Sequence, residues 1–267
     1  MDNFVDERDY KLLDGEKYTF AILRMIMGKP CQLLLTDHER LILCKNFEAF
    51  PAWAWTPDGA SPEEMERAYT LASAHSLIRE GEHFYLKYDL AAYWIARAAE
   101  DGLRITVSSN NNAYDCPRPI PPAAAADGDL RKCTEGDLDE LAAFLNRFHI
   151  EARLDRQDMD ACREEAERLI KAGKTYFWNN GQGQNVGCCS YGVDGELAPI
   201  SNVFISPEFR RRHYAENLVY QVTAIAADAG LTPMLYADAD YEASNGCYKK
   251  IGYVLRGKLC TVEITRI

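Results

Sequence analysis

The stretch of sequence that decides the fold is VFISPEFRRRHYA, which runs from Val203 to Ala215. Apolar and β-branched residues precede Pro207, and apolar residues at helical spacing follow the arginines, so the pattern predicts a strand, a short loop and a helix. The first amide groups of a helix have no intrahelical partners, and the helix dipole adds partial positive charge there. Three consecutive arginines at 210–212 concentrate more positive charge at the same place. The stretch therefore predicts a site for phosphate-like anions, although a solvated arginine patch paired with acids is the alternative.

A second segment, LYADADYEASNGCYKKIGY, extends from Leu235 to Tyr253 and predicts a strand followed by a short helix. Gly252 is expected to end that helix. Asn245 and Tyr248 are three residues apart, so they share one helical face and can present an amide and a phenol to one ligand. Taken alone, Tyr248 is more readily explained as a packing tyrosine.

The rest of the second half extends this pattern in both directions. It predicts the element order β-α-α-β-β-β-α-β-α, closed by a strand pair around Gly257. Gly173 and Gly230 are expected to end two of the helices. The predicted elements are a strand at 130–134, helices at 135–149 and 158–173, strands at 175–180, 185–193 and 198–206, a helix within 209–230, a strand at 233–240, a helix at 242–252 and the strand pair within 253–264.

A proline- and alanine-rich segment at residues 117–128, PRPIPPAAAADG, divides the chain. Its four prolines cannot continue a helix or donate to a central sheet, so it predicts a linker or long loop between a domain at 1–116 and a domain at 129–267. The first half has the pattern of a mixed α/β domain. Its predicted helices cover 13–28, 61–81 and 90–102, and its predicted strands cover 31–37, 40–46 and 83–89. Trp53 and Trp55 are interpreted as structural aromatics rather than as the lining of a pocket.

The composition excludes several classes of protein. The 267 residues include 30 Lys and Arg against 41 Asp and Glu, a net charge of −11, which disfavours general binding to nucleic acid or anionic lipid. No apolar run is long enough to span a membrane, and the acidic start MDNFVDERDY is unlike a signal peptide. The nine cysteines form no C-x-x-C pair, and neither they nor the five histidines show metal-ligand spacing. We therefore expect a cytoplasmic protein with reduced, mostly buried cysteines, no metal, no nucleic-acid partner and no membrane association.

The two segments, in this order and at this separation, resemble the GNAT superfamily of N-acetyltransferases. Ile205 through Arg210 together with Ala215 match the family's acetyl-CoA motif V-x-P-x-x-R-G-x-G-x-A, and Ala243 through Tyr253 match its A-S-N-x-x-Y-x-x-I-G-Y signature. The resemblance covers about residues 129–267. It implies a mixed α/β fold, the acyl-CoA N-acyltransferase fold, with a central mixed, mostly antiparallel sheet. By architecture alone, residues 1–116 resemble the degenerate, GNAT-like partner domain of two-domain members.

The resemblance implies roles for the residues of both segments. The backbone of Val203, Phe204 and Ile205 would pair with the pantetheine arm of acetyl-CoA as an added strand does. The pyrophosphate would lie against the loop and the start of the helix. The cofactor-binding residues implied there are Arg210, Arg211, Arg212, His213, Tyr214, Ala215 and Glu216. Asn245 would hydrogen-bond the cofactor, and Tyr248 would be the general acid that protonates the departing thiolate.

The sequence departs from the family pattern at several positions. Arg211 and His213 stand where the family has two loop glycines, which let the backbone approach a pyrophosphate and adopt unusual dihedral angles. Histidine is nonetheless among the residues enriched at positive φ, and its imidazole could donate to a phosphate. Tyr241-Glu242 replaces the N-P that precedes the signature in many relatives, so a second cofactor contact is expected to be absent.

Direct transfer to an amine also needs a base, because a free amine is protonated at neutral pH. Asp238 and Asp240 are the tentative candidates, since they lie at the end of a strand next to the expected acetyl position. Glu196, which opens the strand before the phosphate loop, and a chain of water molecules are the alternatives. The sequence therefore leaves the general base open.

The resemblance implies an acetyl-CoA-dependent N-acetyltransferase that moves an acetyl group to a primary amine of a small molecule or peptide. The rivals are a non-catalytic acyl-CoA-binding regulatory module and, more weakly, an interaction protein with a decayed site. The negative net charge favours a cationic acceptor such as a polyamine, an amino sugar or a lysine side chain. The sequence leaves the acceptor and the oligomeric state open.

Overall fold

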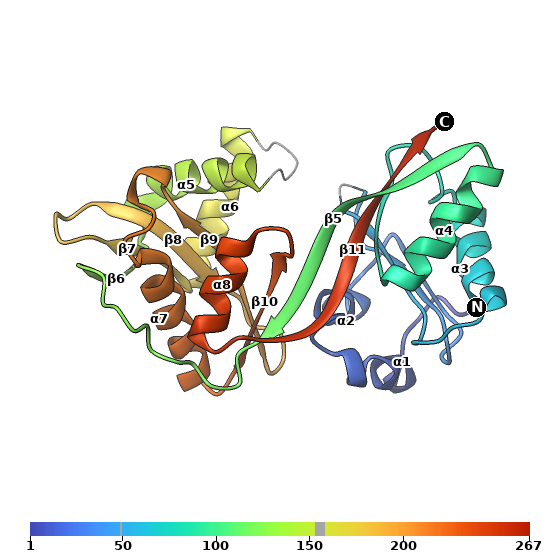
Figure 1. The fold of residues 1–267 in the computed structure, drawn as a ribbon, viewed down its shortest axis with the longest axis horizontal. Helices are drawn as coiled ribbons and strands as arrows, with labels where there is room; N and C mark the ends of the chain where they lie inside the picture. The colour runs from blue at the N-terminus through green and yellow to red at the C-terminus, as the bar shows by residue number, and fades with distance from the viewer. Residues whose placement is uncertain (49, 153–157) are drawn as a thin grey trace. The chain divides into compact units, whose positions relative to one another are not determined.

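The computed structural model describes residues 1–48, 50–152 and 158–267 (Figure 1). These residues pack as two compact units. The first contains Met1–Tyr114, Tyr236–Tyr241 and Leu255–Ile267, and the second contains Asp115–Leu235 and Glu242–Val254. Two C-terminal segments that the sequence pattern groups with 129–267 thus belong to the first unit, because strands pack by their partners in a sheet and not by their order in the chain.

The second unit is a sheet with helices on both faces (Figure 1). Strands β6, β7, β8 and β9 pair antiparallel in chain order, and β10 joins β9 in parallel. Helices α5 and α6 cover one face, where Phe144, Phe177 and Phe204 pack together in the core, and α7 covers the other. The bounds are β6 Asp129–Lys132, α5 Leu138–Glu151, α6 Met159–Ala172, β7 Thr175–Asn179, β8 Asn185–Tyr191, β9 Leu197–Ile205, α7 Tyr214–Asp228, β10 Thr232–Asp238 and α8 Glu242–Ile251. This arrangement confirms the predicted mixed, mostly antiparallel α/β fold.

Local sequence signals set the helix ends of the second unit. The Asp158 carboxylate caps α6 by accepting a hydrogen bond from the backbone N–H of Ala161. Gly173 ends the same helix in the left-handed conformation, with φ 67°, as predicted. Gly230 follows α7 with φ 79°, again at the predicted position. These ends depend on single residues, which is why the pattern of the chain predicts them.

In the first unit the strand order is β1-β2-β3-β4-β11-β5. Its two cores lie under different helices: Tyr69, Phe84 and Trp94 pack with α3 and α4, whereas Phe20 and Trp53 pack with α2. Trp53 and Trp55 are buried in this second core, which confirms that they are structural. The bounds are α1 Glu7–Leu12, α2 Ala21–Met27, β1 Leu33–Thr36, β2 Ile42–Lys45, β3 Ala52–Trp55, α3 Pro62–Ala74, β4 His83–Leu86, α4 Tyr88–Glu100, β5 Leu103–Asp115 and β11 Val254–Arg266.

Some predicted elements differ from the structure. The predicted helix at 13–28 is a 3-10 turn at Asp14–Glu16 followed by α2, and it is interrupted where the carbonyls of Tyr18 and Thr19 accept hydrogen bonds from the Tyr236 hydroxyl. The sequence pattern does not predict β5, because its Ser- and Asn-rich run is typical of a loop. The predicted strand pair at 253–264 is the single strand β11. Gly257 makes no turn there; a Cβ at this position would overlap the Thr19 side chain.

All nine cysteines are free thiols. Seven are buried, and Cys31 and Cys247 are half-buried, as expected for reduced cysteines that act as small apolar residues. None of the helices in the described ranges combines the length and the apolar character that a bilayer span needs.

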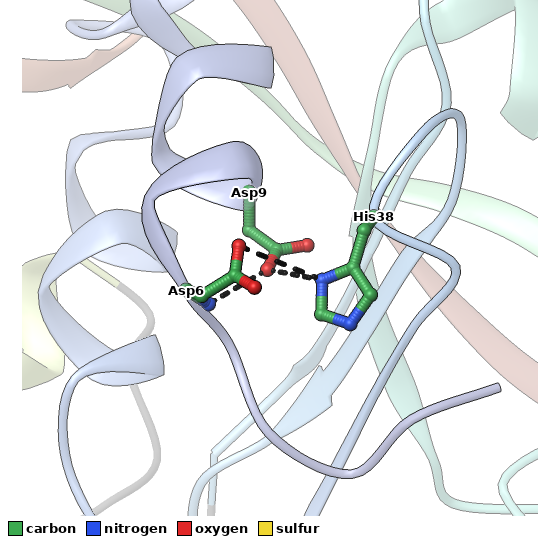
Figure 2. A group of neighbouring side chains, drawn as sticks. All are labelled: Asp6, Asp9 and His38. Atoms are coloured by element: carbon green, nitrogen blue, oxygen red, sulfur yellow. Dashed lines mark hydrogen bonds and ion pairs between the residues drawn. The ribbon is translucent and has the colours of Figure 1, made fainter.

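Within the first unit, a charge cluster around the buried residues Asp9 and His38 joins the N-terminal residues to the turn after β1 (Figure 2). Nδ1 of His38 lies 2.7 Å from the buried carboxylate of Asp9, and Nε2 lies 3.0 Å from the carboxylate of Asp2. Asp6 lies beside this pair, with Oδ1 3.9 Å from Nδ1 of His38, and is itself bound by Arg8. The two ring nitrogens of His38 therefore each face an acceptor, which suits the protonated, doubly donating imidazolium.

Asp6, Asp9 and His38 also form the one group of close potential metal ligands in the described part of the chain. The carboxylate of Asp9 already accepts hydrogen bonds from Thr36 and from the backbone N–H of Asp6, besides its contact with His38. Arg8 binds both oxygens of Asp6. Because these neighbours satisfy the ligand atoms, we interpret the group as an ion-pair cluster.

The charge cluster predicts a pH-dependent contribution to stability. Burial opposes the charged imidazole, but the hydrogen bonds that it donates to Asp9 and then to Asp2 raise the pKa of His38 above its ordinary value. A raised native-state pKa means that the stabilisation is complete below the unfolded-state pKa of about 6.5 and is lost as the pH rises through the native-state value. We expect the difference in Tm between the wild type and His38→Asn to be largest near pH 6 and to shrink towards pH 9.

The variant suits this position because His38 has φ 60°, a conformation that asparagine tolerates. Thermal unfolding from pH 5.5 to pH 9 measures the difference. A difference in Tm that stayed constant, or that grew with pH, would show that the proton on His38 does not hold the cluster together.

Candidate functional site

The centre of the candidate site is a bulge in β9. Ser201 pairs with Ser190 and Phe204 pairs with Cys188, so two residues of β9 lie opposite Cys189 alone. The first of the two, Asn202, has φ 53°. A bulge of this kind bends a strand and redirects its backbone groups, and bulges are common beside active sites. The bulge therefore lies at residues 202 and 203, directly before the point where β9 resumes its pairing with β8.

Strand β9 is paired with β10 only at its beginning. The parallel ladder joins Leu197, Ala198 and Pro199 to the residues 232–234, and the described pairs end there. On its other side β9 keeps its partner, since Phe204 and Ile205 still pair with β8. Gly187 of β8 makes this possible, because a Cβ there would overlap the Phe204 carbonyl and the Ile205 side chain. The two strands thus separate after Pro199, leaving one backbone edge of β9 without a ladder to β10.

The loop after β9 has two residues in the left-handed conformation. A 3-10 turn at Pro207–Phe209 opens the loop, and Arg211 and His213 then have φ 61° and φ 64°. Non-glycine residues seldom adopt these angles. They are the positions at which the sequence has side chains in place of glycines, so the loop keeps a backbone path that glycine favours although it carries arginine and histidine.

Arg210 supports this loop from within the protein. Its Nε donates to the Ile205 carbonyl at 2.9 Å, and its Nη2 lies 2.6 Å from the carboxylate of Glu151 at the end of α5. The guanidinium also lies over the Phe204 ring, 5.8 Å from its centroid. By contrast, Arg211, Arg212 and His213 are exposed to solvent. Of the three consecutive arginines, the second and third can therefore meet an anion, whereas the first is occupied by the loop itself.

The first turn of α7 is held by the segment at 117–128. The buried Tyr214 donates its hydroxyl to Asp127 at 2.6 Å, and the other oxygen of Asp127 accepts from the backbone N–H of Gly181 at 2.8 Å. Asn217, one turn later, donates to the Ala124 carbonyl at 3.0 Å. The hydrogen bond from Tyr214 lowers the pKa of the Asp127 carboxyl, and burial followed by this bond raises the pKa of Tyr214. The proline-rich segment is thus bound to the helix start.

Glu216 connects the first turn of α7 to α8. One carboxylate oxygen lies 2.7 Å from Nζ of Lys250, and the other lies 3.4 Å from Nδ1 of His213. The bond to Lys250 lowers the pKa of Glu216 most. Because the Lys250 ammonium pairs with this carboxylate, the carboxylate adds little net negative charge beside the exposed arginines.

Helix α8 buries the two side chains predicted to share a face. Asn245 is 6% exposed and Tyr248 is 8% exposed. The Tyr248 ring meets the edge of the Tyr253 ring at 5.8 Å, and the Tyr253 hydroxyl lies 2.8 Å from Oγ1 of Thr223 on α7. Tyr248 therefore has a packing role, which is the simpler interpretation of this residue in the sequence. Its burial also keeps the phenol out of bulk water.

Comparison with known protein families decides what this arrangement is. The model of the acetyltransferase (GNAT) family matches residues 138–253, which include the bulge, the loop and α8. These residues are a GNAT acetyltransferase domain. This confirms the resemblance that the two sequence segments predict for the second half of the chain. No curated protein matches the sequence.

Solved structures share the fold of the GNAT domain and of the chain around it. A Drosophila protein is similar with a TM-score of 0.66 and 13% identity, over 97% of this chain and 96% of its own. A GCN5-related N-acetyltransferase from Sphaerobacter thermophilus has a TM-score of 0.64 and 13% identity, over 97% and 91% of the two chains. A GNAT-family acetyltransferase from Colwellia psychrerythraea has a TM-score of 0.57 and 13% identity, over 87% and 84%. At this identity the likeness concerns the fold alone.

The proposed bases of the GNAT reaction lie at the end of β10, in the first unit. The Asp240 carboxylate accepts a hydrogen bond from Nδ2 of Asn110 at 2.8 Å, and the Asp238 carboxylate accepts from the backbone N–H of Asp240 at 2.9 Å. Both side chains are exposed. The alternative, Glu196, accepts through its backbone carbonyl a hydrogen bond from the N–H of Thr232, where β9 and β10 begin. Asp238 and Asp240 thus stay candidates, and their part in proton transfer is a proposal.

Asp127 is the residue near the GNAT loop that the sequence motifs do not identify. It is the only acid in the proline- and alanine-rich segment 117–128, and this is the one signal that could have singled it out. Its carboxylate joins the first residue of α7 to the turn after β7. Only the tertiary structure brings residues 127, 181 and 214 together.

The left-handed loop of the GNAT domain predicts that glycine stabilises the chain at position 213. A left-handed residue with a Cβ costs about 1–2 kcal/mol, and the greater freedom of an unfolded glycine offsets part of the gain. We expect His213→Gly to raise the free energy of unfolding by up to about 1 kcal/mol, as measured by denaturant titration.

The matched control is His213→Ala, which removes the same imidazole but keeps the Cβ and therefore the backbone strain. Loss of the solvent-exposed contact with Glu216 is common to both variants and has a small effect. If the alanine variant were as stable as the glycine variant, the left-handed conformation at 213 would not be strained.

Proposed function

We propose that this chain is an acetyl-CoA-dependent N-acetyltransferase that moves the acetyl group directly to a primary amine of a small molecule or peptide. The observation that carries the proposal is the loop before α7. Its backbone takes, at Arg211 and His213, the left-handed path that the family's glycines favour, and it leads into a helix of 15 residues. The loop keeps this backbone path although it lacks the family's glycines. This supports a functional binding site over a decayed one.

The pyrophosphate of acetyl-CoA would be bound by backbone and side chain together. The N–H groups at 211–216 include the free donors of the first turn of α7, where the helix dipole favours an anion. Arg211 and Arg212 add exposed guanidinium groups, which suit phosphate oxygens. Arg210 would act indirectly, by holding the loop against Ile205 and Glu151.

The pantetheine arm would lie along the edge of β9 that has no ladder to β10. An extended chain can pair there with the backbone at 203–205, as in strand addition. The bulge at Asn202 redirects backbone groups at this point, and one N–H can stabilise the oxyanion of the tetrahedral intermediate. Removing such a donor raises the activation barrier by about 3–4 kcal/mol in enzymes where this has been tested.

The chemical step would use α8. The amine nitrogen attacks the thioester carbonyl carbon, a tetrahedral intermediate forms, and the carbon–sulfur bond breaks when the intermediate collapses. The Tyr248 phenol gives its proton to the departing thiolate, while the amine loses a proton to the base or to water. Asn245 would hydrogen-bond the bound acetyl-CoA from the same buried helical face. Asp238 and Asp240 are the proposed bases.

Release of the CoA thiol tests the proposal. The full chain is incubated with acetyl-CoA and a panel containing a polyamine, an amino sugar and a lysine-containing peptide, and free thiol is followed against a sample without amine. We expect release that depends on one class of amine. Calorimetric binding of acetyl-CoA without release in any sample would support the acyl-CoA-binding module instead. Absence of both would contradict the whole assignment.

A further inference from the structure

Two cysteine thiols are in contact in the first unit, far in sequence from the GNAT motifs. Sγ of Cys44 lies 3.7 Å from Sγ of Cys31, and this is the one contact between two thiols in the described residues. Cys44 lies in β2 and is fully buried, whereas Cys31 precedes β1 and is half-buried. Sulfur atoms at this separation need only a small movement to reach bonding distance.

We propose that Cys31 and Cys44 are an oxidative modification site, at which hydrogen peroxide converts the two thiols into an intrachain disulfide. Cys31 would react first because it is the thiol that solvent reaches. Burial, and then the neighbouring Cys31, raise the pKa of the Cys44 thiol, which leaves it protonated and slow to react with an oxidant directly. Cys44 therefore acts as the resolving thiol, held in contact with its target.

The reaction balances in two steps. The Cys31 thiol attacks one oxygen of the peroxide, the O–O bond breaks, and a sulfenic acid and one water form. The Cys44 sulfur then attacks the Cys31 sulfur, the S–O bond breaks, and the leaving hydroxide takes the Cys44 proton as a second water. Two thiols lose two electrons in total, and the peroxide gains them. A thiol reductant reverses the change.

Cys31 lies in the connection between α2 and β1. Its thiol is in contact with the carbonyls of Ile26 and Lys29, so it lies against the end of α2 and the turn that follows, and not inside a strand. Cys44 is fixed by the ladder of β2 with β1 and β3. A disulfide would thus join the turn after α2 to the middle of the sheet of the first unit, and it would restrict the unfolded chain.

The chain is suited to a direct test, because Arg40 lies between the two cysteines. The native protein is treated with a small excess of hydrogen peroxide, its free thiols are alkylated, and trypsin is added without reductant. We expect the peptide 25–40, which carries Cys31, to be joined to the peptide 41–45, which carries Cys44. The intact protein should lose 2 Da, and reductant should restore both the mass and the separate peptides.

Cys31→Ser should abolish the joined peptide. The matched control is Cys247→Ser, which removes the other half-buried cysteine and should leave the joined peptide in place. The oxidised wild type should also melt about 5 °C higher than the reduced protein, since a cross-link stabilises through the unfolded state. Recovery of the two peptides separately, with Cys31 carrying added oxygen atoms or the alkyl group, would overturn the proposal.

Discussion

Replacing Tyr248 with phenylalanine is expected to lower kcat for acetyl transfer about 100-fold, while the affinity for acetyl-CoA changes less than about twofold. In the proposed mechanism the phenol supplies a proton to the departing thiolate, and a positioned general acid contributes about 10²–10⁴-fold. The phenylalanine ring keeps the edge contact with Tyr253, so packing is largely retained. Steady-state release of CoA measures kcat, and calorimetry measures the binding of acetyl-CoA.

Tyr253→Phe is the matched control, because Tyr253 is the other ring of the same buried pair. It loses the hydrogen bond with Thr223, which is expected to lower the free energy of unfolding by about 1 kcal/mol. It should change kcat far less than Tyr248→Phe does. Equal losses of kcat in both variants would mean that Tyr248 contributes packing and not a proton.

Removing Arg211 and Arg212 together, by Arg211→Ala with Arg212→Ala, is expected to weaken binding of CoA about 10- to 30-fold at low salt. In the proposed complex each exposed guanidinium would add a charge-assisted contact to the pyrophosphate, and solvent screening would weaken that contact. Alanine keeps a Cβ at position 211, where φ is 61°, so the backbone strain stays the same. The dependence of affinity on salt concentration should also become flatter, because fewer charges are screened.

The control for this experiment changes the net charge equally at a distant place. Arg168→Ala with Lys171→Ala removes two cations from the exposed side of α6. Calorimetry of both double variants at two salt concentrations separates a local contact from a general effect of charge. Equal affinities for CoA in the two double variants would contradict the placement of the pyrophosphate at the loop.

The GNAT domain could largely be predicted from sequence because its signals are local. Gly173 ends α6, Asp158 begins it, and apolar periodicity marks α7, and each of these depends on neighbours within a few residues. The same is true of Asn245 and Tyr248, whose spacing alone places them on one helical face. The first unit was harder to predict, because β5 has a loop-like composition and becomes a strand through its partners in the sheet.

By itself the sequence determined the order of strands and helices in the second half and the presence of the A-S-N signature after the loop before α7. It also led to the prediction of an anion site at that loop. Only the tertiary structure decided that Arg211 and His213 take the glycine-like backbone path, that Arg210 faces inward, and that Asp127 holds Tyr214. It also brought Cys31 against Cys44. The physical reason is that helix ends and periodic faces follow from interactions between near neighbours, whereas strained dihedral angles and contacts between distant residues exist only when the rest of the packed chain maintains them.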